Sequence, residues 1–353
     1  MLLILFFITI AISFICSYSI EKLFVKYSLF LDVPTKRSSH DMPKPTAGGI
    51  SILLSYLIYI FLLLSFNQIF IPEIDGNQEQ TSQVFYILLL SLVPIIIISL
   101  FDDLKKVNIT LRLIVQFFSA AIIIYYFYIR SDNSTFNINN YSQQSSFMII
   151  ILSIILSMWL RNLYNFMDGI DSYASIQCIF VSLSASIFSY VNNPENFTYL
   201  YILGLGLANI GFLCRNIHPA KIFMGDTGSV SIGCIFAFFI FYSASESILS
   251  IYTWLILLSI FVIDSSYTLL VRIVTKKNIS EAHLTHAFHK ITRKCNSPIT
   301  TNKILIYINI FWIFPLAATS NIYIDYNLLV TIIAYLPLLF FLINIGAGLE
   351  EEH

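Results

Sequence analysis

The residues best suited to chemistry in this sequence lie in one short stretch, RNLYNFMDGIDSYAS at 161–175, between two long apolar segments. Its carboxamides and carboxylates are Asn162, Asn165, Asp168 and Asp171. Because a carboxylate in mid-membrane costs about 2.5–3.5 kcal/mol, the stretch predicts a wet, protein-lined pocket or a position at the membrane interface. The last three are spaced by three, so in a helical turn they would share a face, and Gly169 would leave the backbone open to a ligand. Such a face suits a cation or a nucleotide; the alternative is a polar helix end capped by Asn and Asp.

Four further polar clusters each border an apolar segment. They are VPTKRSSHDMPKPTAGG (33–49), FDDLKK (101–106), RNIHPAKIFMGDTGS (215–229) and SEAHLTHAFHKITRK (280–294). Paired aspartates, Gly-rich turns and a histidine series differ from the mixed charges of an ordinary solvated loop. The five clusters together therefore indicate a site, with five independent helix-end caps as the alternative.

Two clusters suggest magnesium and phosphate chemistry. The adjacent carboxylates of Asp102 and Asp103 fit a base or a metal site, while Lys106 either holds a nucleotide or only follows the positive-inside rule. In MGDTGS, glycines flank Asp226 just before an apolar segment. Flexible glycines, a carboxylate and helix N-terminal amides together predict a phosphate and magnesium site, with an N-cap Asp that binds nothing as the alternative.

The other two clusters are basic. His283, His286 and His289 are spaced by three, so on a helix they would share one face. Zinc is the alternative ligand there, but the hard carboxylates of the other clusters favour magnesium and phosphate. In the first cluster, Lys44 and other basic residues lie among prolines. This loop suits a lipid phosphate, or it anchors the chain at the membrane surface.

The composition predicts an all-α, polytopic integral membrane protein with one domain, 1–353. Of the 353 residues 57% are hydrophobic and 11% are charged, and the mean hydropathy is +0.80. Apolar runs of roughly 17–25 residues, enough to cross a bilayer, recur along the chain. Eleven are expected, with ten as the lower count, at 2–20, 48–70, 83–100, 111–129, 146–162, 171–191, 199–214, 229–247, 252–272, 304–320 and 327–347. The five scattered cysteines suggest neither a disulfide framework nor a zinc site.

The distribution of basic residues predicts the orientation. The positive charges near the first run follow it, which predicts an outside N-terminus. Of the nineteen Lys and Arg residues, every one except Arg130 then falls inside or beside an inside segment. All five polar clusters are therefore expected on the cytoplasmic side.

The clusters resemble, in chain order, the signatures of the polyprenyl-phosphate N-acetylhexosamine-1-phosphate transferases, a family within glycosyltransferase family 4. The similar segments cover residues 32–290 and are DVPTKRSSHDMPKPTAGG, SLFDDLKKVNITLRLIVQF, NLYNFMDGID, PAKIFMGDTGS and EAHLTHAF. NLYNFMDGID, VIDSSYTLLVRIV and EAHLTHAF look most like the branch that initiates O-antigen-type chains with N-acetylfucosamine or N-acetylquinovosamine phosphate. They look less like the peptidoglycan branch, whose last motif is a run of consecutive histidines.

The resemblance implies a reaction and a set of partners. Undecaprenyl phosphate would attack the sugar-bearing phosphorus of a UDP-N-acetylhexosamine, release UMP and start a lipopolysaccharide or other cell-surface chain at the bacterial inner membrane. Phosphoryl transfer needs positioning and charge neutralisation above all. Mg²⁺ is the implied cofactor, with Mn²⁺ as a substitute. The lipid bilayer is a partner, nucleic acid is not, and a homodimer is left open.

The resemblance also assigns roles to residues of this chain. Asp226 would bind magnesium, and Asp102 or Asp103 would deprotonate or orient the lipid phosphate. His283 and His286 would contact the diphosphate, and Lys44 would bind substrate. The nucleotide and uracil pocket would be formed by Lys106, Asn165, Asp168, Gly169, Asp171, Asn216 and Phe223.

Three departures from the family pattern affect the choice of sugar more than the reaction type. Ser172 and Tyr173 follow Asp171 where many relatives read DGIDGLA, and His289 replaces a glutamine common in the branch. The loop PKPTAGG often has an Arg and a third Gly in relatives. A secondary transporter of an anionic or nucleotide-like substrate is the alternative function, but it predicts mid-span polar groups and an internal repeat, and neither is clear here.

Overall fold

The structure, a computed structural model, describes residues 2–32, 42–70, 77–130, 143–278 and 283–350, and in these ranges it is almost entirely helical. The two strands found there, β1 (Leu31–Asp32) and β2 (Lys44–Pro45), pair antiparallel with Leu31 opposite Pro45. The helices are α1 (Leu2–Tyr27), α2 (Gly49–Phe70), α3 (Asn77–Leu104), α4 (Ile109–Arg130), α5 (Gln143–Phe166), α6 (Tyr173–Asn192), α7 (Thr198–Asn216), α8 (Gly225–Ser245), α9 (Ile251–Leu257), α10 (Ser259–Val274), α11 (Ala287–Cys295), α12 (Pro298–Ile308), η2 (Asn309–Ile313), α13 (Phe314–Ile322), η3 (Ile324–Tyr326) and α14 (Asn327–Ile345).

The polytopic helical bundle is confirmed. Within the described ranges, nine helical spans are long and apolar enough to cross a membrane, and the bent pair α9–α10 makes ten. The apolar part of α2, Gly49–Ser65, is shorter than these. Each of the eleven apolar runs expected from the sequence overlaps one or more of the helices, because long uninterrupted apolar segments have no other way to satisfy their backbone groups in lipid.

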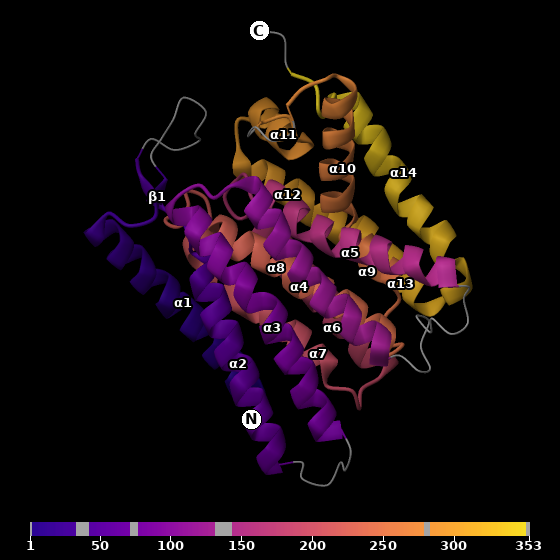
Figure 1. Cartoon of the computed structure of the whole chain (residues 1–353). Coiled ribbons are helices and arrows are strands. Elements are labelled where there is room, and N and C mark those ends of the chain that lie inside the picture. Colours follow the sequence, from indigo (N-terminus) through magenta and orange to yellow (C-terminus); the bar gives the residue numbers. More distant parts are fainter. Residues whose placement is uncertain (1, 33–41, 71–76, 131–142, 279–282, 351–353) are drawn as a thin grey trace.

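Helix α8 lies at the centre of the bundle. Every residue of its apolar window is buried, and it packs against α2, α3, α4, α5 and α9 (Figure 1). A helix that is apolar on all sides is stable only when other elements surround it. Its N-terminal residues, starting at Gly225, therefore have a position fixed by five neighbours.

The run 252–272, expected as one span, is broken. Helices α9 and α10 meet at Leu258 with a bend of 76°. Neither glycine nor proline marks the break; side chains from other helices bind the carbonyls near it instead. Gln177 Nε2 donates to the carbonyl of Leu257 at 3.0 Å, and Tyr335 Oη donates to that of Leu255 at 2.9 Å. The sequence predicted an apolar run here but not its bend, because the residues that bind these carbonyls are distant in sequence.

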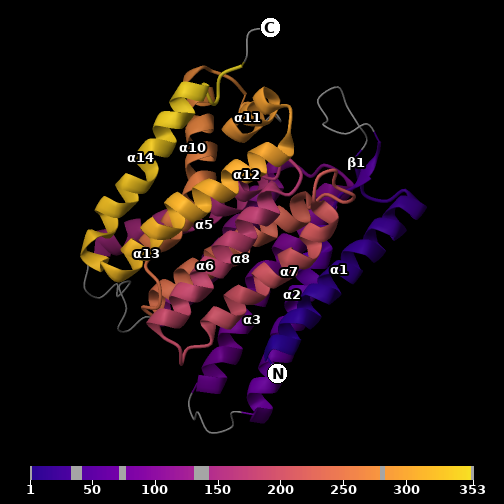
Figure 2. The same ribbon diagram turned by 180° about the vertical axis from the view of Figure 1, so that it is seen from behind.

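The polar clusters gather at one end of the bundle. Both views place β1, α11 and the start of α12 there, while α1 begins at the opposite end (Figures 1 and 2). Helix α14 finishes at the end that holds α11 (Figure 2). A chain that starts at one end and finishes at the other crosses an odd number of times, which is consistent with eleven crossings.

Candidate active site

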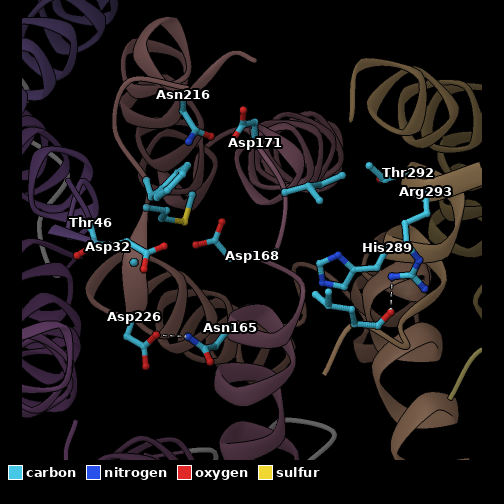
Figure 3. Close-up of a pocket in the computed structure, with 16 residues that line it drawn as sticks. Asp32, Thr46, Asn165, Asp168, Asp171, Asn216, Asp226, His289, Thr292 and Arg293 are labelled. Atoms are coloured by element: carbon cyan, nitrogen blue, oxygen red, sulfur yellow. Dashed lines mark hydrogen bonds between the residues drawn. The ribbon is translucent and has the colours of Figure 1, made fainter. Parts of the chain in front are cut away.

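A cavity of ≈ 490 Å³ opens at the end of the bundle where the clusters meet (Figure 3). Its lining consists of Asp32, Thr46, Asn165, Asp168, Gly169, Ile170, Asp171, Asn216, Phe223, Met224, Gly225, Asp226, Leu284, His289, Thr292 and Arg293. Seven of these were predicted as site residues: Asn165, Asp168, Gly169, Asp171, Asn216, Phe223 and Asp226. The described lining does not include the other six, which are Lys44, Asp102, Asp103, Lys106, His283 and His286.

The end of α5 places Asn165 and Asp168. The helix stops at Phe166, and the N–H of Asp168 bonds to the carbonyl of Asn165 at 3.2 Å in the turn that follows. The prediction that 165, 168 and 171 share a helical face was therefore wrong: Asn165 lies on the last turn of α5, whereas Asp168 and Asp171 lie in the turn after it. Asn165 Nδ2 donates to Asp226 Oδ1 at 2.7 Å, and Figure 3 shows Asp168 between this pair and Asp171.

The cavity brings several carboxyl groups close together. Burial raises the pKa of Asp168 well above its ordinary value, and the nearby carboxylates of Asp226, Asp103 and Asp171 raise it further. Carboxylates that repel one another in a poorly solvated space bind cations strongly. A divalent cation or a basic substrate group in the cavity would reduce this repulsion.

The N-terminus of α8 is capped by Asp103. Its carboxylate accepts hydrogen bonds from the backbone N–H of Asp226 (2.9 Å), from that of Thr227 (3.0 Å) and from Thr227 Oγ1 (2.5 Å). The first amides of α8, predicted to bind phosphate, are therefore already occupied. Gly225 has a φ of 71°, and a Cβ there would lie 3.0 Å from both oxygens of Asp103, so this cap requires glycine.

Arg112 connects the aspartate pair to Asp226. Its Nη1 lies 2.6 Å from Asp102 Oδ2, and its Nη2 lies 2.9 Å from Asp226 Oδ2. Asp102 Oδ1 also accepts the N–H of Val107 at 2.7 Å. Sequence reasoning did not single out Arg112, which supplies the basic group that compensates the two carboxylates. Asp102 and Asp103 thus hold Asp226 from two sides and do not themselves line the cavity.

Asp171 and Asn216 join the loop after α7 to the turn after α5. Asp171 Oδ2 accepts the N–H of Ala220 at 3.0 Å and lies 2.7 Å from His218 Nδ1. Asn216 Oδ1 accepts the N–H of Ser172 at 3.0 Å. Both residues line the cavity and also hold its wall together. His218 was not singled out from the sequence, where one histidine in RNIHPAK carries no signal.

His289 closes the cavity beside Gly169. A Cβ on Gly169 would lie 2.7 Å from the ring of His289, so the absence of a side chain there makes room for this ring, while Gly169 itself lines the cavity. Burial lowers the pKa of His289 to about 3, and the neighbouring His286 lowers it too. His289 is therefore a neutral hydrogen-bonding group at neutral pH.

The three histidines do not share a helical face, contrary to the prediction. Helix α11 begins at Ala287, and His286 precedes it with extended backbone (φ −62°, ψ 151°). The rings of His283 and His286 stack at 5.0 Å, and His286 Nδ1 lies 3.3 Å from Asp264 Oδ1. Burial is the main reason that the pKa of His283 falls to about 4. Asp264, within the segment VIDSSYTLLVRIV, was not predicted as a site residue.

The two predicted lysines lie outside the lining. Lys44 Nζ sits 5.3 Å from the ring centroid of Phe223, so it touches the cavity only through that ring. Lys106 is exposed in the turn after α3. From the first polar cluster, Thr46 reaches the cavity, as does Asp32 from the adjacent β1. The basic residues Lys36, Arg37 and His40 of that cluster lie outside the described residues.

The lining offers oxygen donors suited to magnesium. No three His, Cys, Asp or Glu side chains converge as metal ligands in the described ranges. Mg²⁺ is usually held by one or two carboxylates together with water and substrate phosphates, and not by a full protein cage. Asp168, Asp226 and the amide of Asn165 face one cavity and satisfy that requirement.

The chain is similar in sequence to known transferases. The sequence profile of "Glycosyl transferase family 4" matches residues 85–244, which run from α3 to α8. The chain is 28% identical over 306 residues to the phospho-N-acetylmuramoyl-pentapeptide-transferase of Campylobacter lari, covering 78% of each protein. It is 23% identical over 267 residues to the probable undecaprenyl-phosphate N-acetylglucosaminyl 1-phosphate transferase of Bacillus subtilis, covering 74% of this chain and 69% of the relative.

Proposed function

Because the chain belongs to glycosyl transferase family 4, as a polyprenyl-phosphate hexosamine-1-phosphate transferase, we propose that it transfers a sugar 1-phosphate from a UDP-N-acetylhexosamine to undecaprenyl phosphate. The observation that carries the proposal is the cavity itself. It collects carboxylates and amides from separate clusters at the end of a membrane bundle. A substrate with a lipid tail and a charged head needs such a position.

The proposed reaction is one phosphoryl transfer. An oxygen of the lipid phosphate attacks the sugar-bearing phosphorus, and the bond from that phosphorus to the oxygen of UMP breaks. The products are a lipid diphosphate sugar and UMP. A phosphate monoester has a second pKa of about 6, so the attacking group is already largely ionised at neutral pH. Positioning is then the main task of the protein, and a general base is secondary.

Mg²⁺, or Mn²⁺ in its place, is the proposed cofactor. Asp226 and Asp168 would hold it, and when bound it would neutralise charge on the diphosphate. Asn165 orients the Asp226 carboxylate through its hydrogen bond of 2.7 Å. Arg112 restrains the same carboxylate from the other side, at 2.9 Å.

The remaining lining residues divide between the two ends of the donor. Phe223 and Asn216 would contact the uridine, an aromatic face and an amide being suited to a base. His289, Thr292 and Arg293 on α11 lie across the cavity from Asp226 and would face the sugar and diphosphate (Figure 3). His283 and His286 do not line the cavity and would act indirectly, through the contact between His286 and Asp264.

The finer assignment follows the motif resemblance. We propose an N-acetylfucosamine- or N-acetylquinovosamine-type donor and a role in starting O-antigen or another surface polysaccharide at the bacterial inner membrane. The active-site end would face the cytoplasm, where UDP-sugars are made. The differences at Ser172, Tyr173 and His289 are the positions at which the choice of sugar should be examined first.

The test is direct. Purified protein in nanodiscs receives undecaprenyl phosphate, Mg²⁺ and a panel of UDP-N-acetylhexosamines, and the release of UMP is measured. UMP that appears only when acceptor, donor and metal are all present supports the transferase. Uptake of the nucleotide sugar into vesicles without UMP release would favour the transporter alternative instead.

A further inference from the structure

A second hollow lies on the other side of α11. It is an open groove of ≈ 590 Å³ lined by residues of α11, α12, η2 and α14. Its lining includes two residues from each of three sides: Ile291 and Lys294 from α11, Ile308 and Trp312 from α12 and η2, and Leu338 and Phe341 from α14. Its volume lies within the usual range for a small-ligand site, and its lining is almost wholly apolar.

Helix α11 separates this groove from the active-site cavity. At 3.6 residues per turn, positions 289, 292 and 293 lie on one face and positions 291, 294 and 295 on the opposite face. The first set lines the cavity and the second lines the groove. Whatever fills the groove therefore packs against the back of the helix that carries His289.

The groove opens toward lipid. Phe341 in its wall is 45% exposed, and neighbouring Phe340 and Tyr307 are 67% and 62% exposed. On a membrane-spanning bundle, aromatic side chains this exposed face hydrocarbon. An apolar groove open on that side suits a lipid chain better than water, which gains nothing there.

One charged side chain lines the groove. Trp312 Nε1 donates to the carbonyl of Ala334 at 3.3 Å, and Asn344 Nδ2 donates to that of Phe340 at 3.0 Å, so both polar groups have partners. Lys294 is exposed and forms no ion pair within the described ranges, and the lining contains no carboxylate. A lone ammonium beside an apolar groove complements an anionic head group on an acyl chain.

We propose that this groove is a binding site for an anionic diacyl phospholipid, with one chain between α12 and α14 and the head group at Lys294. The site is separate from that of the acceptor lipid. The acceptor phosphate must reach Asp226, which faces the cavity on the other side of α11. The bound phospholipid would stabilise the position of α11 by packing against the helix face opposite the cavity.

The test uses Trp312 as a reporter inside the groove. A Trp159→Phe protein is reconstituted with brominated-chain phosphatidylglycerol or brominated-chain phosphatidylcholine at equal mole fractions, and the quenching of tryptophan fluorescence is measured. Trp254 is fully buried and does not meet lipid. The same protein with Trp312→Phe gives the background to subtract. The readout involves no enzymatic activity, so its failure would leave the transferase proposal intact.

The expected result is a roughly fivefold preference for phosphatidylglycerol, which corresponds to about 1 kcal/mol per basic side chain at an anionic surface. Lys294→Ala should abolish this preference, and Lys303→Ala, on exposed α12 surface outside the groove, should keep it. Equal quenching by both lipids, or a preference that survives Lys294→Ala, would overturn the proposal. So would relief of quenching by undecaprenyl phosphate but not by excess unbrominated phosphatidylglycerol, because the groove would then belong to the acceptor.

Discussion

Replacement of Arg112 by alanine tests whether the aspartate pair acts through Asp226. The guanidinium joins Asp102 at 2.6 Å and Asp226 at 2.9 Å, and no other described side chain bridges these two carboxylates. Without it, both carboxylates lose their ion pair. The Asp226 carboxylate then keeps its hydrogen bond from Asn165 but has no cationic partner to offset the repulsion from the other aspartates of the cavity.

The magnitude follows from burial. The side chains of Arg112, Asp102 and Asp226 are 23%, 11% and 26% exposed, so solvent screens these ion pairs only in part. A hydrogen bond to a charged group at such a site contributes about 1.5–3 kcal/mol. If only the bond to Asp226 matters for the transition state, turnover falls by about ten- to a hundredfold. Arg112→Lys keeps one of two contacts and should fall between wild type and alanine.

The assay is UMP release under saturating substrates, with thermal unfolding measured on the same preparations. A positioning role predicts a lower kcat with little change in the KM for the UDP-sugar. It also predicts that Asp102→Asn adds little once Arg112 is gone, because the two changes disrupt one network. Lys105→Ala, an exposed neighbour at the end of α3, is the matched control and should be silent. A folded Arg112→Ala protein that keeps more than half of the wild-type kcat would refute this account.

Three other changes have clear expected outcomes. Asp226→Asn should abolish metal-dependent UMP release without lowering the unfolding temperature, and turnover near the wild-type rate would exclude Asp226 as the metal ligand. Because His289 is neutral at pH 7, His289→Gln should change turnover less than twofold. Alanine at 283, 286 or 289 should each reduce turnover at least tenfold. If the histidines bound zinc, His289→Gln would reduce turnover as much as His289→Ala. The pKa of His289 falls from 6.5 in the unfolded chain to about 3 in the folded protein. As the pH falls from 6.5 to about 3, the unfolded chain takes up this proton first, so the unfolding free energy should fall by about 1.4 kcal/mol per pH unit in that window. In denaturant unfolding, His289→Gln should make the unfolding free energy depend less on pH. An unchanged pH dependence would assign the acid sensitivity to other groups.

Local features of the sequence were enough to predict the class of fold and the main wall of the cavity. Apolar runs of membrane length specify helices through their own backbone, so each expected run overlaps one or more helices. Carboxylates at span ends are costly in lipid, so Asp168, Asp171 and Asp226 were expected to share a polar site, and all three line the cavity. Neither result required knowledge of which helices pack together.

Only the tertiary structure decided which side chains meet. Asp103 caps helix α8, whose Thr227 is 124 residues away in sequence. Arg112 on α4 joins Asp102 on α3 to Asp226 on α8. The break between α9 and α10 depends on Gln177 and other distant partners. The α11 register places His289 in the cavity and not the two histidines before it. A period or a motif describes one segment at a time, whereas each of these contacts is fixed by the packing of several segments around the buried helix α8.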